Sequence, residues 1–347
     1  MKNEEKGQKG RSPLSIRTEE RDVGMKKVVV ITTGGTIAMK YDPLTKGLVP
    51  AVSGEDLIEA VPELADVADV EVVEFSNVPS GHVTPKMMFE LAKLADKYAA
   101  EEDVAGIVIT HGTDTQEETI YLLSLVLETS KPVCITGAMR GASEMGPDGP
   151  ANILAAVKVA ACKEAVGRGA MLVFNDEIHA AAEVTKTHST SCSTFASPGW
   201  GPIGHVYFDK VVFRRQPENL QKIKTEVIEE DVYLIKTVAG MDDYLFKCLA
   251  EKPVKGIVVE ALGCGNVPLG VKKGIEYVRS CGIPVVLATR VHAGRVVPAY
   301  SYEGSALSMA ASNIILAGEL TGQKARIKLM LVLGITKNVD SICKYFD

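Results

Sequence analysis

The sequence lacks the cysteine patterns of a metal site or a disulfide framework. Its seven cysteines are an odd number, and they form no C-x-x-C pair and no His/Cys cluster. Zinc sites and disulfide-rich secreted domains depend on such spacings. We therefore expect neither a zinc site nor disulfide bonds, and a location in the reducing cytoplasm.

Two further absences limit the partners. No apolar run approaches the roughly 18 residues of a membrane span, and no signal-peptide core precedes a small-residue cleavage site. The formal net charge is −6, whereas proteins that bind nucleic acid or anionic membranes present a basic face. We expect no nucleic acid and no membrane as a partner.

The sequence does have enough apolar material for a sizeable core. It has 347 residues, of which 46% are hydrophobic, and this length is typical of two domains. Residues 1–24 are dominated by Lys, Arg, Glu and Gly, so we expect a disordered tail there. Met25 directly precedes the first apolar run and is an alternative start of translation.

Short apolar runs alternate with segments of helical period. Residues 85–98 and 120–127 repeat apolar side chains every three or four positions, which predicts crossover helices. Continuous apolar runs are typical of parallel strands covered on both faces. We predict an α/β fold with a doubly wound, flavodoxin-like parallel sheet and strands at residues 28–32, 70–75, 106–110, 133–136 and 171–174.

A change in composition indicates a second domain. Residues 214–231 begin RRQPEN and continue as a charged, weakly apolar stretch, which is typical of a linker. Strand-like runs resume at residues 232–236, 256–259 and 284–287. We predict an N-terminal α/β catalytic domain over 25–213, a linker over 214–231 and a smaller C-terminal α/β domain over 232–347.

A glycine-hinged loop rich in hydroxyl groups follows the first predicted strand. Residues 32–38 read TTGGTIA. Glycines let the backbone turn sharply and leave room for a ligand, and a threonine oxygen can attack a carbonyl. On its own, such a loop is more often a tight turn than a catalytic element.

A second loop of similar chemistry, THGTDT at residues 110–115, also leaves an apolar strand. Thr115 and Glu118 have capping-box spacing, which predicts that a helix begins here. The free N–H groups of a helix N-terminus favour a developing negative charge. Because loops at the carboxyl ends of parallel strands share one crevice, we expect Thr36 and Thr113 to face one bound molecule.

Lys186 is a third candidate. It lies in residues 184–188, VTKTH, a polar stretch with no helical stripe. Taken singly, Thr113 and Asp114 fit a helix cap, and Lys186 fits a surface lysine. A lysine enclosed in a threonine-lined pocket is instead suited to moving protons.

The two loops resemble the two signature motifs of the bacterial-type L-asparaginases, a family that includes glutaminase-asparaginases. Other blocks resemble the family in the same order and extend the likeness from about residue 25 to the C-terminus: residues 131–140, 148–152, 184–187, 201–204 and 323–326. The resemblance implies hydrolysis of the side-chain amide of L-asparagine, with L-glutamine as a further substrate. It also implies that no metal or organic cofactor is needed.

The resemblance assigns roles to individual residues. It implies that Thr36 is the nucleophile that forms an acyl-enzyme, and it leaves open which of Thr36 and Thr113 reacts first. Thr113, Lys186 and Asp114 would form a second set of hydroxyl, base and carboxylate, and Asp114 would also bind the substrate ammonium. Ser80 matches the serine that holds the substrate carboxylate.

Two positions depart from the family pattern. Leu48 stands near the place of a lid tyrosine, and Tyr41 is our candidate to replace that tyrosine. Gly81 follows Ser80 where the family usually has a polar side chain, and His82 is our candidate to supply the missing contact.

The family completes its site with residues from a neighbouring subunit. Asn266 matches the asparagine of that set, and Glu303 is our candidate for the glutamate. The resemblance therefore implies a homo-oligomer, a dimer or a tetramer, with shared active sites.

Three other functions fit part of the sequence. The amidase subunit of a tRNA-dependent amidotransferase carries the same two loops, but it has an extra N-terminal β-domain, for which 24 residues are too few. A non-catalytic protein that binds acidic amino acids fits the fold, although all three reactive residues, Thr36, Thr113 and Lys186, are present. A nucleotide-binding domain is disfavoured because the G-x-G-x-x-G and G-K-[ST] patterns are absent.

Overall fold

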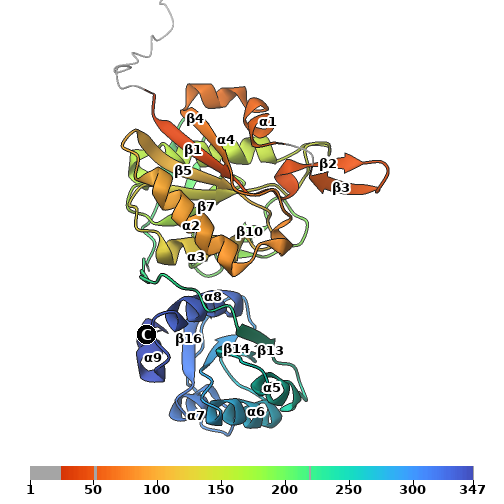
Figure 1. Ribbon diagram of the computed structural model, residues 1–347, viewed down its shortest axis with the longest axis vertical. Helices are drawn as coiled ribbons and strands as arrows, with labels where there is room; N and C mark the ends of the chain where they lie inside the picture. The colour runs from red at the N-terminus through yellow and green to blue at the C-terminus, as the bar shows by residue number, and fades with distance from the viewer. Residues whose placement is uncertain (1–24, 51–52, 219, 347) are drawn as a thin grey trace, which may run out of the picture.

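The computed structural model describes residues 25–50, 53–218 and 220–346. The tail expected at residues 1–24 lies outside the described residues. A larger N-terminal part and a smaller C-terminal part are stacked along the long axis of the molecule (Figure 1). None of the described helices is long and apolar enough to cross a membrane.

The N-terminal part is built on an eight-stranded sheet in the order β12-β11-β8-β7-β6-β5-β1-β4. Five of its strands are parallel, and they confirm the five predicted runs. These are β1 (Lys27–Thr32), β4 (Asp69–Glu74), β5 (Val104–Thr110), β6 (Val133–Thr136) and β7 (Ala170–Phe174). Because β4 lies on one side of β1 and β5 on the other, the strand order reverses between β1 and β5.

Helices cover both faces of this sheet, which is why its strands are apolar on both faces. Val29 and Ile31 of β1 pack in a core with α2 (Pro85–Ala99) and α3 (Gln116–Val126). The intervening Val28 and Val30 pack in a second core on the opposite face. That second core includes α1 (Gly54–Glu59), the 3₁₀ helix η2 (Pro62–Asp66) and α4 (Gly149–Ala160).

The sheet extends beyond the predicted strands and is mixed. Three short antiparallel strands continue it past β7: β8 (Glu177–Ala180), β11 (Gly204–Val206) and β12 (Val211–Phe213). Two further pairs stand apart from the sheet: the hairpin of β2 (Met39–Asp42) with β3 (Gly47–Pro50), and the ribbon of β9 (Thr185–Lys186) with β10 (Phe195–Ala196). None of these strands was predicted, because they have two to four residues and most of them contain polar residues or glycine.

The C-terminal part has a four-stranded parallel sheet in the order β13-β14-β15-β16. Its strands are β13 (Val232–Lys236), β14 (Gly256–Ala261), β15 (Val285–Thr289) and β16 (Ile315–Thr321), of which the first three were predicted. Its helices are α5 (Tyr244–Ala250), α6 (Leu269–Ser280), α7 (Ala306–Ala311), α8 (Gly322–Leu333) and α9 (Val339–Phe346). The two-domain α/β fold is thus confirmed. We propose that the linker is residues 214–231, whose described residues form no helix or strand.

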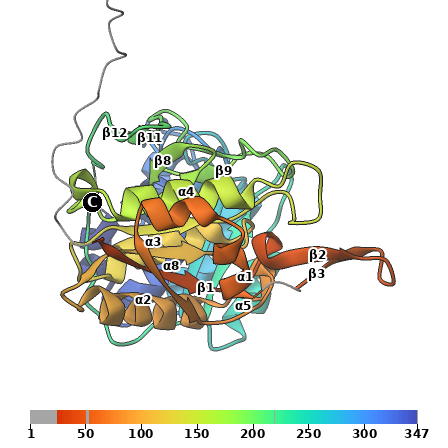
Figure 2. The same ribbon diagram turned by 90° about the horizontal axis from the view of Figure 1, so that it is seen from above.

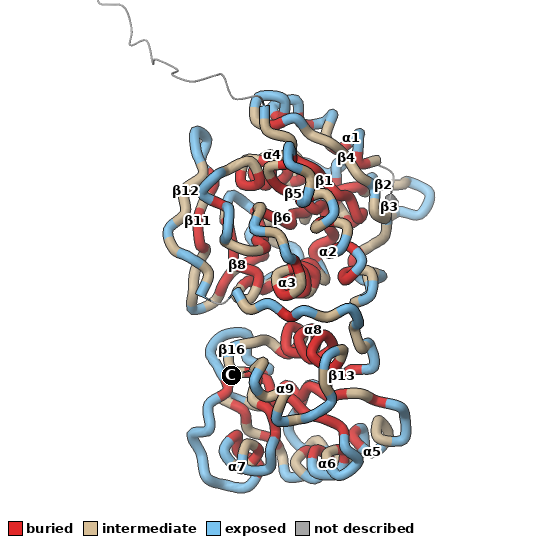
Figure 3. Tube along the Cα trace, turned by 60° about the vertical axis from the view of Figure 1, so that its left-hand side comes forward, coloured by how far each residue is buried: buried red, intermediate tan, exposed pale blue. Residues whose placement is uncertain are grey.

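The two parts meet through helices α3 and α8. Helix α8 packs on the C-terminal sheet, and one apolar core runs from that sheet through α8 to α3. Both helices are buried where the two parts face each other (Figure 3). The N-terminal domain is therefore packed against the C-terminal domain through these two helices.

A buried histidine fixes the junction between β5 and α3. His111 Nδ1 lies 2.7 Å from the carbonyl oxygen of Gly112, and Nε2 lies 3.0 Å from the hydroxyl of Thr119. Because a carbonyl can only accept, Nδ1 carries the proton and Nε2 accepts from Thr119. Burial lowers the pKa of His111 to about 4, so the ring is neutral near pH 7.

We predict that His111 makes the fold less stable in mildly acidic solution. Folding lowers the pKa of this ring from 6.5 to about 4, so the unfolded chain binds the proton more tightly. The stabilisation is complete above pH 6.5 and is lost as the pH falls toward 4, by about 3 kcal/mol in total. Urea unfolding across this range should show a smaller loss for His111→Gln than for the wild type.

His292→Gln, at an exposed position, is the control and should lose stability as the wild type does. An equal loss in the wild type and His111→Gln would contradict the prediction.

Candidate functional site

Three loops leave the N-terminal sheet at one level. Thr32 at the end of β1 is in register with Thr110 at the end of β5, and Thr110 is in register with Thr136 at the end of β6. The first two loops flank the position where the strand order reverses. Ligands of open α/β sheets bind in the crevice at such a position.

The first two loops touch through glycine backbone. Gly35 has a φ of +87°, and a Cβ built on it would lie 2.4 Å from both N and Cα of Gly112. Gly34 has a φ of +100°, and a Cβ there would lie 2.5 Å from the backbone nitrogen of Val78. No side chain fits at either position, so the glycines bring the first loop against the second loop and against residues 77–78.

Thr36 begins a short 3₁₀ helix, η1 (Thr36–Ala38), directly after this contact. The amide of Ala38 donates to the carbonyl of Gly35 at 2.9 Å. The buried Ile37 faces the start of α4, where a Cβ on Gly149 would lie 2.9 Å from it. The turn therefore fixes the backbone at Thr36, directly after the glycine that approaches Gly112.

Lys186 joins the threonine and the aspartate of the second loop. Its Nζ lies 2.9 Å from Thr113 Oγ1 and 2.7 Å from Asp114 Oδ1. Thr113 is 6% exposed and the Lys186 side chain 14%, whereas the Asp114 side chain is 74% exposed. The ammonium is thus shielded and hydrogen-bonded on one side, while the second carboxylate oxygen of Asp114 stays open to a ligand.

Two contacts fix the strand that carries Lys186. Lys186 pairs with Phe195 of β10, and the Phe195 ring packs edge-on against Phe174 with 5.1 Å between centroids. The amide of Lys186 lies 3.4 Å from Oε1 of Glu117, a buried residue on α3. Glu117 is not among the residues predicted from the sequence, because a glutamate in the first turn of a helix is ordinary and nothing in its spacing points to β9.

Ser80 is buried beneath the second loop. Its hydroxyl accepts a hydrogen bond from the amide of Asp114 at 3.2 Å, and its carbonyl accepts one from the Thr115 hydroxyl at 2.8 Å. The predicted capping box of Thr115 and Glu118 is therefore wrong, because the Thr115 hydroxyl is used by Ser80, although α3 does begin at Gln116. The hydroxyl hydrogen of Ser80 is left to donate to a ligand.

The candidate lid is the β2–β3 hairpin, which projects from the body beside the first loop (Figure 2). Tyr41 on β2 is 54% exposed and is the register partner of Leu48 on β3. The Tyr41 amide donates to the hydroxyl of Ser143 at 2.8 Å. His82 is exposed, and the position of Gly81 opens onto free space.

Asn266 and Glu303 belong to the C-terminal domain. Asn266 follows β14, and its buried Oδ1 has no hydrogen-bond partner among the described residues. Glu303 is paired with Lys272 at 3.1 Å. Neither residue has a hydrogen bond or ion pair to the two loops within the described part of this chain.

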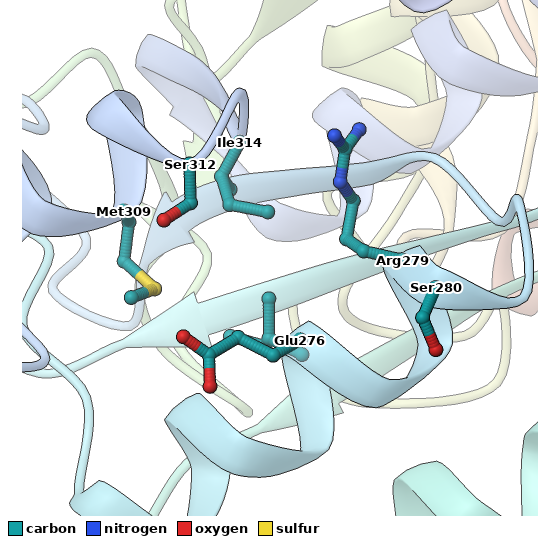
Figure 4. A pocket seen from close by; sticks show the side chains of 7 residues that line it. Glu276, Arg279, Ser280, Met309, Ser312 and Ile314 are labelled. Carbon is teal, nitrogen blue, oxygen red and sulfur yellow. The ribbon is translucent and has the colours of Figure 1, made fainter.

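Two hollows lie apart from the two loops. One, of about 310 Å³, is next to α6 and α7 and is lined by Glu276 and Arg279 among others (Figure 4). The other, of about 730 Å³, lies where the two domains meet, and its lining includes Thr185 and Lys328. Neither is lined by a residue of the two loops. Among the described residues, no group of three or more His, Cys, Asp or Glu side chains is placed to hold a metal ion.

The two-loop site has the parts of an acyl-transfer centre. A threonine hydroxyl can act as the nucleophile, and a shielded lysine next to a second threonine can move a proton. The start of α3 presents its positive end to the same space. The arrangement suits attack on a carbonyl followed by loss of a basic leaving group.

Comparisons with known proteins agree along nearly the whole chain. Residues 27–219 match the family model described as Asparaginase, N-terminal, and residues 231–346 match the one described as Glutaminase/Asparaginase C-terminal domain. The chain is 35% identical to L-asparaginase 2 of Bacillus subtilis, over 99% of this chain and 91% of that protein. It is 33% identical to the glutaminase-asparaginase of Pseudomonas aeruginosa, over 91% of this chain and 88% of that protein.

A solved structure is similar as well. The crystal structure of the probable cytoplasmic L-asparaginase from Campylobacter jejuni matches with a TM-score of 0.83 and 33% identity, over 92% of this chain and 99% of that one. Both halves of the chain, its two signature loops and its fold therefore lead to one conclusion: this protein belongs to the asparaginase family.

Proposed function

We propose that the protein is an L-asparaginase that hydrolyses the side-chain amide of L-asparagine. L-Glutamine is the further substrate that we propose. The observation that carries the proposal is the Lys186 ammonium, which bridges Thr113 and Asp114 beside the loop that presents Thr36. Relatives named L-asparaginase and glutaminase-asparaginase support both substrates.

The reaction has two steps. The Thr36 oxygen attacks the side-chain carbonyl carbon, the C–N bond breaks, and ammonia leaves with the proton that Thr36 loses. Thr113 and Lys186 relay that proton, since their hydroxyl and amine are 2.9 Å apart. Water then attacks the ester, which releases aspartate and returns a proton to the Thr36 oxygen.

Asp114 and Ser80 are our candidates to hold the α-amino and α-carboxylate groups of the substrate. Asp114 uses Oδ1 for Lys186, and its second oxygen is open to bind the substrate ammonium. Ser80 accepts from the Asp114 amide, so its own hydrogen can donate to the substrate carboxylate. His82 is our candidate for the ammonium contact that Gly81 cannot make.

Tyr41 is our candidate for the lid tyrosine. Tyr41 on β2 is paired with Leu48 on β3, and Leu48 stands near the position where the family has its lid tyrosine. The two positions are therefore neighbours across the hairpin. The exposure of Tyr41 is consistent with an open lid. Closure of the hairpin over the first loop would bring the Tyr41 hydroxyl toward Thr36.

We propose a homo-oligomer, a dimer or a tetramer, in which Asn266 and Glu303 complete the site of a neighbouring subunit. Within the described part of the chain, Asn266 and Glu303 contact residues of their own domain and not the two loops, which supports this arrangement. We also propose a cytoplasmic location, which is supported by the name of the Campylobacter jejuni relative.

Thr36→Ala should lower the rate of ammonia release from asparagine by on the order of 10³-fold or more, because the nucleophile is lost. Thr36→Ser keeps a hydroxyl and is the matched control, which should retain measurable activity. Wild-type activity in Thr36→Ala would contradict the proposed mechanism. Asparagine binding without turnover by the wild type would favour the non-catalytic alternative, and activity that needs a copurifying tRNA-binding subunit would favour the amidotransferase.

Shared sites can be tested by subunit complementation. Thr36→Ala and Asn266→Ala should each be nearly inactive alone, because each damages every site of its own oligomer. If two chains share each site, a mixed pair has one site with both substitutions and one with neither, so unfolding and refolding the two variants together should recover activity. Failure to recover activity, with mixed oligomers verified by native mass spectrometry, would argue against sharing.

A further inference from the structure

One sequence block that resembles the family has no role in the two-loop site. Residues 323–326, Gln-Lys-Ala-Arg, lie in the first turns of α8, in the C-terminal domain. Lys324 of this block is 1% exposed and is among the largest fully buried side chains. A buried lysine needs compensation, because it loses its hydration. The groups that compensate it lie in the other domain.

The Lys324 ammonium reaches across the domain junction to the chain just before β9. It donates to the carbonyl of Ala182 at 3.1 Å and also to the carbonyl of Val184. Its Nζ lies 5.8 Å from the centre of the Tyr121 ring on α3. Burial lowers the pKa of Lys324 to about 8, and the nearby carboxylates of Glu117 and Glu183 oppose that shift.

These carbonyls lie directly before the lysine of the proposed site. Val184 is two residues from Lys186, and β9 is a strand of just two residues. Such a strand cannot fix its own orientation through ladder hydrogen bonds alone. Its position depends on β10 on one side, on Glu117 at the Lys186 amide, and on Lys324 at the carbonyls before it.

We propose that Lys324 is a positioning residue, through which helix α8 of the C-terminal domain holds the strand that aims Lys186 at Thr113 and Asp114. This inference rests on the proposed function of Lys186. The two charge-assisted hydrogen bonds fix residues 182–184, and the fixed strand sets the 2.9 Å contact between Lys186 Nζ and Thr113 Oγ1. The C-terminal domain thereby supports the site of its own chain.

The same helix offers a matched control. Lys328 lies four residues after Lys324, is also buried, and burial lowers its pKa to about 8 as well. It packs over the ring of Phe346 at 4.8 Å, and among the described residues it makes no hydrogen bond to the chain before β9. Both lysines contribute to the packing of α8, but among the described residues Lys324 alone of the two hydrogen-bonds to residues 182–184.

The kinetic test compares Lys324→Met with Lys328→Met. We expect Lys324→Met to lower kcat for asparagine by about 10- to 100-fold relative to Lys328→Met, with KM changed by less than about twofold, because Lys186 is misaligned. Lys324→Arg, which keeps a cation, should recover part of the loss. Equal kcat in Lys324→Met and Lys328→Met would overturn the proposal, and so would an equal loss in Lys324→Arg and Lys324→Met.

Hydrogen exchange gives a readout that does not depend on activity. The peptide covering residues 182–187 should exchange faster in Lys324→Met than in the wild type or in Lys328→Met. Unchanged exchange would overturn the proposal. If Lys324→Met does not fold, Lys324→Gln, which keeps a polar donor, replaces it in both measurements and should change them in the same direction.

The two measurements separate this inference from the proposed function. If the wild type releases no ammonia, the proposed function fails. Faster exchange at residues 182–187 in Lys324→Met would still show that the hydrogen bonds of Lys324 hold β9 in place. If the wild type is an asparaginase and Lys324→Met behaves as Lys328→Met does, the inference about Lys324 fails alone.

Discussion

The close approach of Gly35 to Gly112 is the contact on which the rest of the site depends. A single added carbon on Gly35 would lie 2.4 Å from the Gly112 backbone, so the distance between the two loops is set by the absence of a side chain. The loops must also start at the same edge of the sheet. They do so because Thr32 at the end of β1 is in register with Thr110 at the end of β5. Together they bring two threonine loops from distant parts of the chain to one crevice.

In the proposed mechanism, Lys186 is the residue that moves a proton between the two loops. The amine reaches the second loop from a separate two-stranded ribbon, and it is hydrogen-bonded to Thr113 and Asp114. Strand β9, which carries Lys186, and the residue directly before it are contacted by three elements: β10, α3 and α8. A site that the sequence places in the N-terminal domain is thus supported in part by the C-terminal domain of the same chain.

The sequence predicts the parts of the fold that have a strong periodic signal. The buried parallel strands and the helix at residues 85–98 are continuous or regular apolar patterns, and the structure has them within two residues at each end. The antiparallel strands β8 and β11 contain Glu, His or Gly among their apolar residues, and β12 has just three residues, so none of them gives such a pattern. Thr115 has capping-box spacing, but in the folded chain its hydroxyl donates a hydrogen bond to the carbonyl of Ser80 and does not cap the helix.

The candidate residues of the two loops could be found from sequence because each motif is local. The contacts that position Lys186 could not be predicted in this way. Glu117 is 69 residues from Lys186 along the chain, and Lys324 is 140 residues from Val184. Neither residue carries a spacing that points to its partner. The family resemblance indicated the block around Lys324 but gave it no physical role. The role we propose comes from the structure, in which the buried amine of Lys324 donates to two carbonyls.

The central claim is that Thr36, and not Thr113, carries the acyl group during turnover. Acid quenching during turnover of asparagine, followed by proteolysis and mass spectrometry, would locate the ester. The account predicts an aspartyl ester on the peptide that contains Thr36. An ester on Thr113, or on any other residue, would contradict it.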